Sequence, residues 1–176
     1  YVQSDEISIF VKNYMELDTQ SWFDNGLQKM VSVSAGMASA VFTSLSHKIF
    51  GVSKLALFDS RAFVLPKEEV NNYFIWRQQD CSRNSVQMLA RSLYSHRECN
   101  NKNNAELQEM CFTKGINWND LVTSYKRGRC IIRKEAEKEV CNRHTNEIVK
   151  VVRSSWVIDN EIPIFSKDPD YINQYI

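Results

Sequence analysis

Two adjacent acids, Asp5 and Glu6, stand near the start of the chain, between Ser4 and an apolar stretch that begins at Ile7. Carboxylates next to apolar residues are costly to bury, because desolvation disfavours their charged form. A divalent cation is a usual compensation, and Mg²⁺ is typically held by one or two carboxylates together with substrate phosphates. The alternative is a polar strand end exposed to solvent. The pair is therefore a candidate site for cation-assisted phosphate chemistry.

A second set of polar side chains recurs at intervals of three and four residues. The set is Arg77, Asp80, Asn84, Gln87 and Arg91. This spacing aligns them in one stripe along a helix. A stripe that combines cations, a carboxylate and amides could hold phosphates and ribose hydroxyls. The alternative is a solvent-facing helix surface, although the flanking aromatic residues Tyr73 and Trp76 indicate partial burial.

Three isolated charged positions leave two interpretations open. Lys29 lies in a segment rich in small residues, where it either extends to solvent or reaches a triphosphate held by a cation at Asp5. Asp59 and Arg61 are two residues apart in a β-like segment, so both project to the same face. They either form an ion pair, or Arg61 contacts a phosphate.

A run of basic residues, Lys126-Arg127-Gly128-Arg129, is either a solvated surface or an RNA contact. The common glycine-rich phosphate loops are absent from the sequence, so nucleotide binding by a P-loop or dinucleotide motif is excluded.

Composition sets the class of protein. The chain has 176 residues, 43% hydrophobic residues and a net charge of +1, which is ordinary globular composition without a strong basic excess. No apolar run approaches the roughly 20 residues of a membrane span, and no secretory signal opens the chain. Five cysteines without paired spacing indicate reduced thiols, as expected in the cytoplasm. Cys141 and His144 alone are too few ligands for tetrahedral zinc.

The apolar periodicity predicts the elements that position these residues. The predicted helices are 22–50, 67–97, 105–112 and 119–125, and the predicted strands are 2–11, 55–65, 129–133 and 148–158, the last two forming a hairpin around a charged tip. Pro66 and the acids Glu68 and Glu69 are start signals for the second helix. We expect one α+β domain over residues 1–176 with a single sheet. Because the chain begins within a predicted strand, we expect it to lack an N-terminal part.

Four motifs occur in an order that resembles the tRNA-His guanylyltransferase superfamily. They are Ser4-Asp5-Glu6, Phe58-Asp59-Ser60-Arg61, the block from Tyr73 to Asn84 that contains W-R-Q-x-D, and Tyr125-Lys126-Arg127-Gly128. The segment Trp156 to Tyr171 resembles the C-terminus of that family. The resemblance covers nearly the whole chain. It implies a polymerase-like palm, a ferredoxin-like antiparallel sheet with packed helices.

The resemblance also implies an activity. Members add nucleotides to tRNA 5′ ends in the 3′-to-5′ direction, with two Mg²⁺ ions, by activating the 5′ end with a nucleoside triphosphate such as GTP or ATP. By position, Asp5 matches a metal-binding carboxylate and Glu6 its catalytic neighbour. Ser4, Lys29 and Arg61 match positions near the triphosphate, and Arg77, Asn84, Lys126 and Arg127 match positions that meet nucleotide or tRNA. A homotetramer is typical of the family.

Two departures qualify the resemblance. The family's D-G-R-x-F motif, which carries the other metal carboxylate, would lie before Tyr1. The run Ser82-Arg83-Asn84-Ser85 has serine where eukaryotic guanylyltransferases have histidine. It resembles the guanylyltransferase-like branch, which favours template-dependent repair of tRNA 5′ ends. The alternatives are tRNA-His guanylyltransferase proper, another palm-type enzyme such as a nucleotide cyclase, or a non-catalytic RNA-binding relative.

Overall fold

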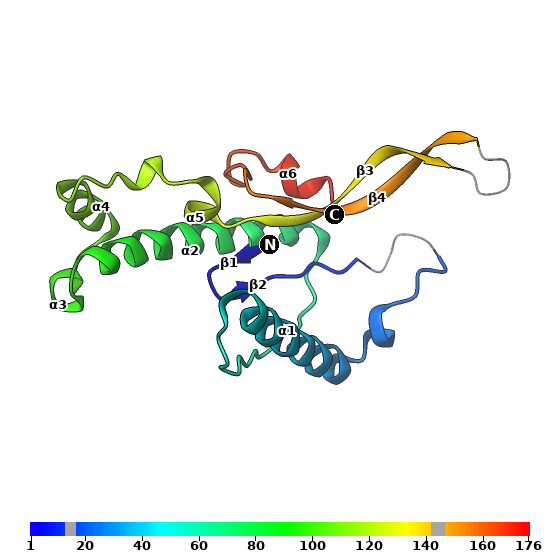
Figure 1. The fold of residues 1–176 in the computed structure, drawn as a ribbon, viewed down its shortest axis with the longest axis horizontal. Coiled ribbons are helices and arrows are strands. Elements are labelled where there is room, and N and C mark those ends of the chain that lie inside the picture. The colour runs from blue at the N-terminus through cyan, green and yellow to red at the C-terminus, as the bar shows by residue number, and fades with distance from the viewer. Residues whose placement is uncertain (13–16, 142–146) are drawn as a thin grey trace. The chain divides into compact units, whose positions relative to one another are not determined.

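The structure, a computed structural model, describes residues 1–12, 17–141 and 147–176 (Figure 1). The chain forms two compact units, one made of residues 1–9 and 67–176 and the other of residues 10–66. The described residues form helices and antiparallel hairpins, which confirms the predicted α+β class. The prediction that the whole chain is one domain stays a prediction. No helix in the described ranges is long and apolar enough to cross a bilayer.

The larger unit is built on α2, which runs from Lys67 to Leu93 (Figure 1). It begins directly after Pro66, with Glu68 and Glu69 in its first turn, as predicted. The predicted continuation to residue 97 is wrong. Ser95 starts a separate short helix, α3 (His96–Cys99), because the Ser95 hydroxyl accepts from the Glu98 amide and the Glu98 carboxylate accepts from the Ser95 amide.

The end of α2 packs on α4 (Asn104–Thr113). Asn103 caps α4 in the same reciprocal way with Glu106. The buried residues of this contact are Val86, Ala90, Leu107 and Cys111. The single helix predicted for residues 119–125 is wrong. A 3-10 turn, η2 (Trp118–Asp120), is followed by α5 (Thr123–Arg127), because the chain is extended at Leu121 and Val122.

A long antiparallel ribbon follows, made of β3 (Cys130–Cys141) and β4 (Ile148–Asp159). Its register runs from Cys130 opposite Asp159 to Cys141 opposite Ile148. The predicted hairpin is confirmed, although β3 is longer than the predicted strand 129–133. The charged tip predicted between the two strands is wrong over residues 134–141, which belong to β3, and residues 142–146 lie outside the described residues. In Figure 1 the ribbon extends away from α2, and burial is confined to its base at Cys130 and Ile132.

The N-terminal segment is a tight hairpin of β1 (Val2–Gln3) and β2 (Glu6–Ile7). The predicted single strand 2–11 is therefore wrong. The chain reverses at Ser4, whose φ of 46° is in the left-handed region. Val2 and Arg129 exchange two backbone hydrogen bonds of 2.9 and 3.0 Å, which join β1 to the residue that precedes β3. In the described ranges, two small sheets thus replace the single predicted sheet.

This junction explains the glycine of the Tyr125–Gly128 motif. Gly128 has a φ of +79°, and a Cβ there would meet the Val2 carbonyl oxygen at 2.5 Å. Only glycine combines this backbone conformation with so close an approach.

The C-terminal tail crosses back over α2 and ends in the short helix α6 (Asp170–Asn173) (Figure 1). Ile162 and Phe165 are fully buried. The Phe165 ring stacks on Tyr171 and meets the edge of Tyr1. Residues 162–169 form no helix or strand before α6 begins.

The second unit contains η1 (Trp22–Asn25) and α1 (Leu27–Phe50). The predicted helix 22–50 begins at Leu27 instead, because the backbone at Phe23 and Asp24 is not helical. The predicted strand 55–65 is wrong. Among the described residues this segment pairs with no strand, and its backbone bonds to α1 side chains. The Ala56 amide donates to Thr43 Oγ1 at 3.1 Å, and the Phe58 amide donates to Ser39 Oγ at 2.9 Å.

Candidate functional site

The β1–β2 hairpin presents Asp5 at its turn. The Asp5 side chain is exposed, and it makes no hydrogen bond or ion pair with any residue that the structure describes. Beside it, Ser4 Oγ lies 4.0 Å from the sulfur of Met88 on α2. A carboxylate that projects from a tight turn with no protein partner can act as a ligand for an external cation.

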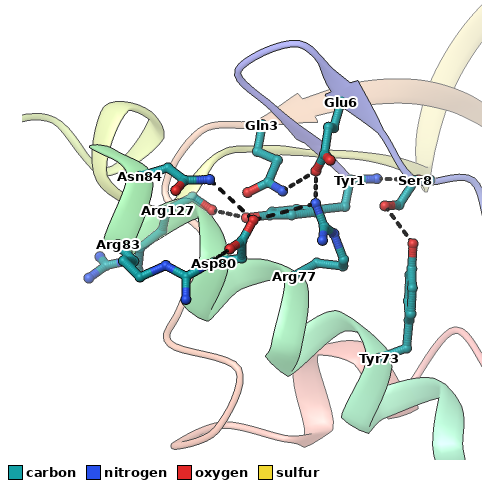
Figure 2. Close-up of polar contacts among 10 residues, drawn as sticks. All are labelled: Tyr1, Gln3, Glu6, Ser8, Tyr73, Arg77, Asp80, Arg83, Asn84 and Arg127. Carbon is teal, nitrogen blue, oxygen red and sulfur yellow. Dashed lines mark hydrogen bonds and ion pairs between the residues drawn. The ribbon is translucent and has the colours of Figure 1, made fainter. Parts of the chain in front are cut away.

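Glu6, the next residue, contacts two other side chains. Its carboxylate accepts from Gln3 Nε2 at 2.6 Å and forms an ion pair with Arg77 of α2. Figure 2 shows the Arg77 guanidinium between Glu6 on the hairpin and Asp80 on its own helix. Its distance to Asp80 Oδ2 is 3.7 Å. The two acids that are adjacent in sequence thus differ in environment, since Asp5 has no partner among the described residues and Glu6 has two.

Asp80 contacts both neighbouring residues of the predicted polar stripe, Arg77 and Asn84. It accepts from Asn84 Nδ2 at 3.2 Å and pairs with Arg83 as well as with Arg77 (Figure 2). The first three residues of the predicted stripe therefore lie side by side on α2 and contact one another. Arg77 also points toward the hairpin that carries Asp5. Asn84 is exposed beside it.

The remaining two positions of the stripe, Gln87 and Arg91, line a separate cavity of about 170 Å³ near α3. His96 and Lys102 contribute to the same cavity. Sequence reasoning did not select His96 and Lys102, because they come from a different helix and a loop.

Lys126 and Arg127 line a larger cavity of about 410 Å³. Lys126 Nζ donates to the Asn119 carbonyl at 2.5 Å and lies 5.8 Å from the centre of the Trp118 ring. Arg127 Nε is buried and has no hydrogen-bond partner among the described residues. Asp5 is not among the lining residues of this cavity. A cationic, amide-lined hollow of this kind suits a phosphate or a nucleotide.

Sequence reasoning missed three side chains at this cavity. Ser82, Arg83 and Trp118 line it. Ser82 and Arg83 were noted only as a departure from a family motif. A tryptophan close in sequence to a basic run was the available signal for Trp118, since aromatic and basic residues together suit nucleic-acid contacts.

Lys29 and Arg61 belong to the second unit. Lys29 lies on α1 with its Nζ 4.8 Å from the centre of the Phe23 ring. Arg61 pairs with Asp59 at 3.1 Å, so the ion-pair alternative is the one observed. Both partners are at least 80% exposed, and such surface pairs contribute little to stability. Arg61 therefore keeps access to an external phosphate.

Asp5 offers a divalent cation a single carboxylate ligand. The described residues contain no group of three or more His, Cys, Asp or Glu side chains arranged around a common point. One unpartnered carboxylate agrees with Mg²⁺, which often takes one or two carboxylates and completes its shell with phosphates and water. Glu6 is a poor second ligand here, because Arg77 and Gln3 already compete for its oxygens.

Together, an α+β fold, a turn that offers a carboxylate and a cationic cavity define a protein suited to phosphate chemistry. Comparison with known proteins is consistent with this class. A family model described as tRNAHis guanylyltransferase matches residues 1–66. A bacterial tRNA(His) guanylyltransferase-like protein in complex with ATP is 46% identical and superposes with a TM-score of 0.85. The match covers all of this chain and 69% of that one. The chain belongs to the tRNA(His) guanylyltransferase family, whose members are nucleotidyltransferases.

Two further relatives support the assignment. A bacterial tRNA(His) guanylyltransferase-like protein in complex with GTP is 47% identical, with a TM-score of 0.78 over 99% of this chain and 67% of that chain. The tRNA(His) guanylyltransferase 1 of Arabidopsis thaliana is 28% identical over 171 residues, 89% of this chain. The chain spans 29% of that plant protein's length.

Proposed function

We propose that this protein adds nucleotides to tRNA 5′ ends in the 3′-to-5′ direction, directed by the opposing strand of the acceptor stem. The observation that carries the proposal is the state of Asp5, exposed at a hairpin turn with no partner among the described residues, while the adjacent Glu6 is tied to α2. The family membership and the ATP and GTP complexes of its structural relatives support it.

Asp5 would hold Mg²⁺, and two ions are expected from the family. When bound, the metal neutralises phosphate charge during phosphoryl transfer. Asp5 supplies carboxylate oxygen at the turn, and Ser4, beside it, offers a hydroxyl and backbone to a triphosphate. Lys126 and Arg127 would hold phosphates of the nucleotide or RNA in the larger cavity. Lys29 and Arg61 are proposed triphosphate contacts, and Asn84 a nucleotide or tRNA contact.

The proposed partners are tRNA and the nucleoside triphosphates GTP and ATP, in the cytoplasm, with a homotetramer as the assembly. Five cysteines without disulfides among them agree with a reducing compartment. The proposal involves no membrane.

Ser82 supports repair over obligate guanosine addition. Because this position lacks the histidine of the eukaryotic motif, we expect base choice to come from pairing with the template strand. A mismatched nucleotide leaves donors and acceptors unpaired, each costing on the order of 1–3 kcal/mol. The two alternatives are tRNA-His guanylyltransferase proper and a non-catalytic RNA-binding relative without the other metal carboxylate.

The test uses the full-length protein, a tRNA that lacks its first 5′ nucleotide, Mg²⁺ and each triphosphate in turn. We expect restoration of the Watson–Crick partner by the wild type and loss of addition in Asp5→Asn. Asp168→Asn, the same change at another exposed acid, is the matched control. Near-normal addition by Asp5→Asn would refute the metal assignment. RNA binding without addition by the wild type would favour the non-catalytic relative.

A further inference from the structure

Arg77 has surroundings unlike those of an ordinary charged residue on a helix surface. Its side chain is 11% exposed, whereas the side chain of Arg83 on the same helix is 61% exposed. It faces two carboxylates, Glu6 from the hairpin and Asp80 from α2. Its guanidinium also lies 4.7 Å from the centre of the Trp76 ring.

These contacts leave Arg77 little capacity for a substrate. A guanidinium binds a phosphate most strongly through two parallel N–H donors, the same geometry that it offers to a carboxylate. A phosphate would therefore have to compete with Glu6 and Asp80 for a guanidinium whose side chain is only 11% exposed. Displacing Asp80, whose side chain is 18% exposed, would remove one of its two cationic partners.

The hairpin, in contrast, needs external support. Each of its strands has two residues, and isolated two-stranded hairpins are marginally stable in water. Ser4 at its turn adopts a positive φ, which is uncommon for a non-glycine residue. Its supports on the larger unit include the backbone pair with Arg129, a 3.1 Å hydrogen bond between the hydroxyls of Ser8 and Tyr73, and the pair of Glu6 with Arg77. Tyr1, directly before β1, adds a 2.5 Å hydrogen bond from its hydroxyl to the Arg127 carbonyl.

We infer that Arg77 is a positioning residue that fixes the turn bearing Asp5 through its ion pair with Glu6, and that it binds neither nucleotide nor RNA. The pair acts on the residue directly after Asp5, so it constrains the direction in which the Asp5 carboxylate leaves the turn. Glu6 is then a positioning residue as well. This inference rests on the proposed function only for what Asp5 does once it is positioned.

Charge and position predict opposite effects on a cation, which makes the inference testable. Removing a positive charge close to Asp5 should by Coulomb's law strengthen cation binding. Loss of positioning should weaken it, since residues that orient a ligand typically contribute roughly 10- to 100-fold to metal affinity or activity. A fall in affinity on loss of Arg77 therefore reports positioning, whereas loss of the Glu6 charge lowers affinity by charge and by positioning together.

The experiment measures Mn²⁺ binding to the full-length protein by the electron paramagnetic resonance of the free ion. We expect Arg77→Met and Glu6→Gln each to raise the Mn²⁺ dissociation constant by roughly tenfold or more. Arg77→Lys, which keeps the charge, should recover part of the loss. Arg97→Met removes an exposed arginine on α3 and should leave the constant unchanged. The double variant Glu6→Gln/Arg77→Met should have a Mn²⁺ dissociation constant no higher than that of the single variant that binds Mn²⁺ less tightly, because both substitutions break the same contact.

A second measurement needs no metal. The Ser8 amide donates to the Tyr1 carbonyl at 2.8 Å, so its hydrogen exchange reports whether the hairpin is closed. We expect faster exchange at Ser8 in Arg77→Met, with the exchange of the α4 amides unchanged as evidence of intact folding. Unchanged Ser8 exchange would overturn the inference. So would a nucleotide KM that rises in Arg77→Met while kcat and Mn²⁺ affinity stay constant, because that split is the signature of a ligand contact.

The two proposals fail in different ways. If the wild type binds Mn²⁺ and adds no nucleotide, the proposed function is wrong, and the Mn²⁺ and exchange comparisons still decide the role of Arg77. If the wild type adds nucleotides and Arg77→Met leaves both comparisons unchanged, the positioning role is wrong and the proposed function stands.

Discussion

The buried amide of Gln78 is expected to be a main anchor of the C-terminal tail. Gln78 is 4% exposed. Its Nε2 donates to the Pro163 carbonyl at 2.8 Å, and its Oε1 accepts from the Phe165 amide at 2.9 Å. One side chain on α2 thus satisfies two backbone groups of a tail segment that has no regular structure of its own. Its removal should be costly, because the tail offers no other partner for those groups.

The size of the effect follows from these two bonds. In Gln78→Leu, the Pro163 carbonyl and the Phe165 amide lose their partners, and each unsatisfied buried group costs about 1–3 kcal/mol. The leucine regains roughly 1 kcal/mol or more through its added apolar surface. We expect a net loss of roughly 2–4 kcal/mol in the free energy of unfolding. In a protein of this size that lowers Tm by roughly 5–15 °C.

The assay is urea unfolding of the variant, followed by circular dichroism, together with hydrogen exchange at Phe165. Gln79→Leu is the matched control, since it makes the same change at the neighbouring, exposed position and should alter stability by about 0.5 kcal/mol or less. A Gln78→Leu protein with the wild-type urea midpoint would refute the reasoning. Faster exchange at Phe165 with an unchanged midpoint would show that the tail detaches locally and contributes little to global stability.

Three further predictions follow from the structure. Gly128→Ala should destabilise the protein by several kcal/mol in thermal unfolding, because a Cβ would lie 2.5 Å from the Val2 carbonyl oxygen and φ is +79°. Burial raises the pKa of the Cys111 thiol, so at neutral pH its thiolate fraction falls, and mass spectrometry should find iodoacetamide on exposed Cys141 first and on Cys111 last. With all four templating bases in turn, the added nucleotide should be the complementary one, and guanosine added regardless of template would return the protein to the tRNA-His guanylyltransferase branch.

Local sequence signals predicted the helices well where caps and charges agree with apolar periodicity. Pro66 and two glutamates set the start of α2, and residues 105–112 fall within α4. The break at Ser95 had a readable signal, since serine three residues before a glutamate is a capping box. The strand predictions at 2–11 and 55–65 failed for a different reason. An apolar extended segment becomes a strand only if a partner strand accepts its backbone bonds, and sequence periodicity does not identify that partner.

The sequence by itself determined the class of the fold and the family, because the Ser4-Asp5-Glu6 motif, the Trp76–Asp80 block and the Tyr125–Gly128 motif are local and, in this order, specific together. It also aligned Arg77, Asp80 and Asn84 on one helix face, since that depends only on the 3.6-residue period. The tertiary structure decided which of the two adjacent acids forms an ion pair with α2. Asp5 and Glu6 carry the same carboxylate group, and the approach of α2 to the hairpin pairs Glu6 with Arg77 while Asp5 is exposed. Ion pairing depends on distances of a few ångströms between segments some 70 residues apart, and the sequence pattern contains no such distance.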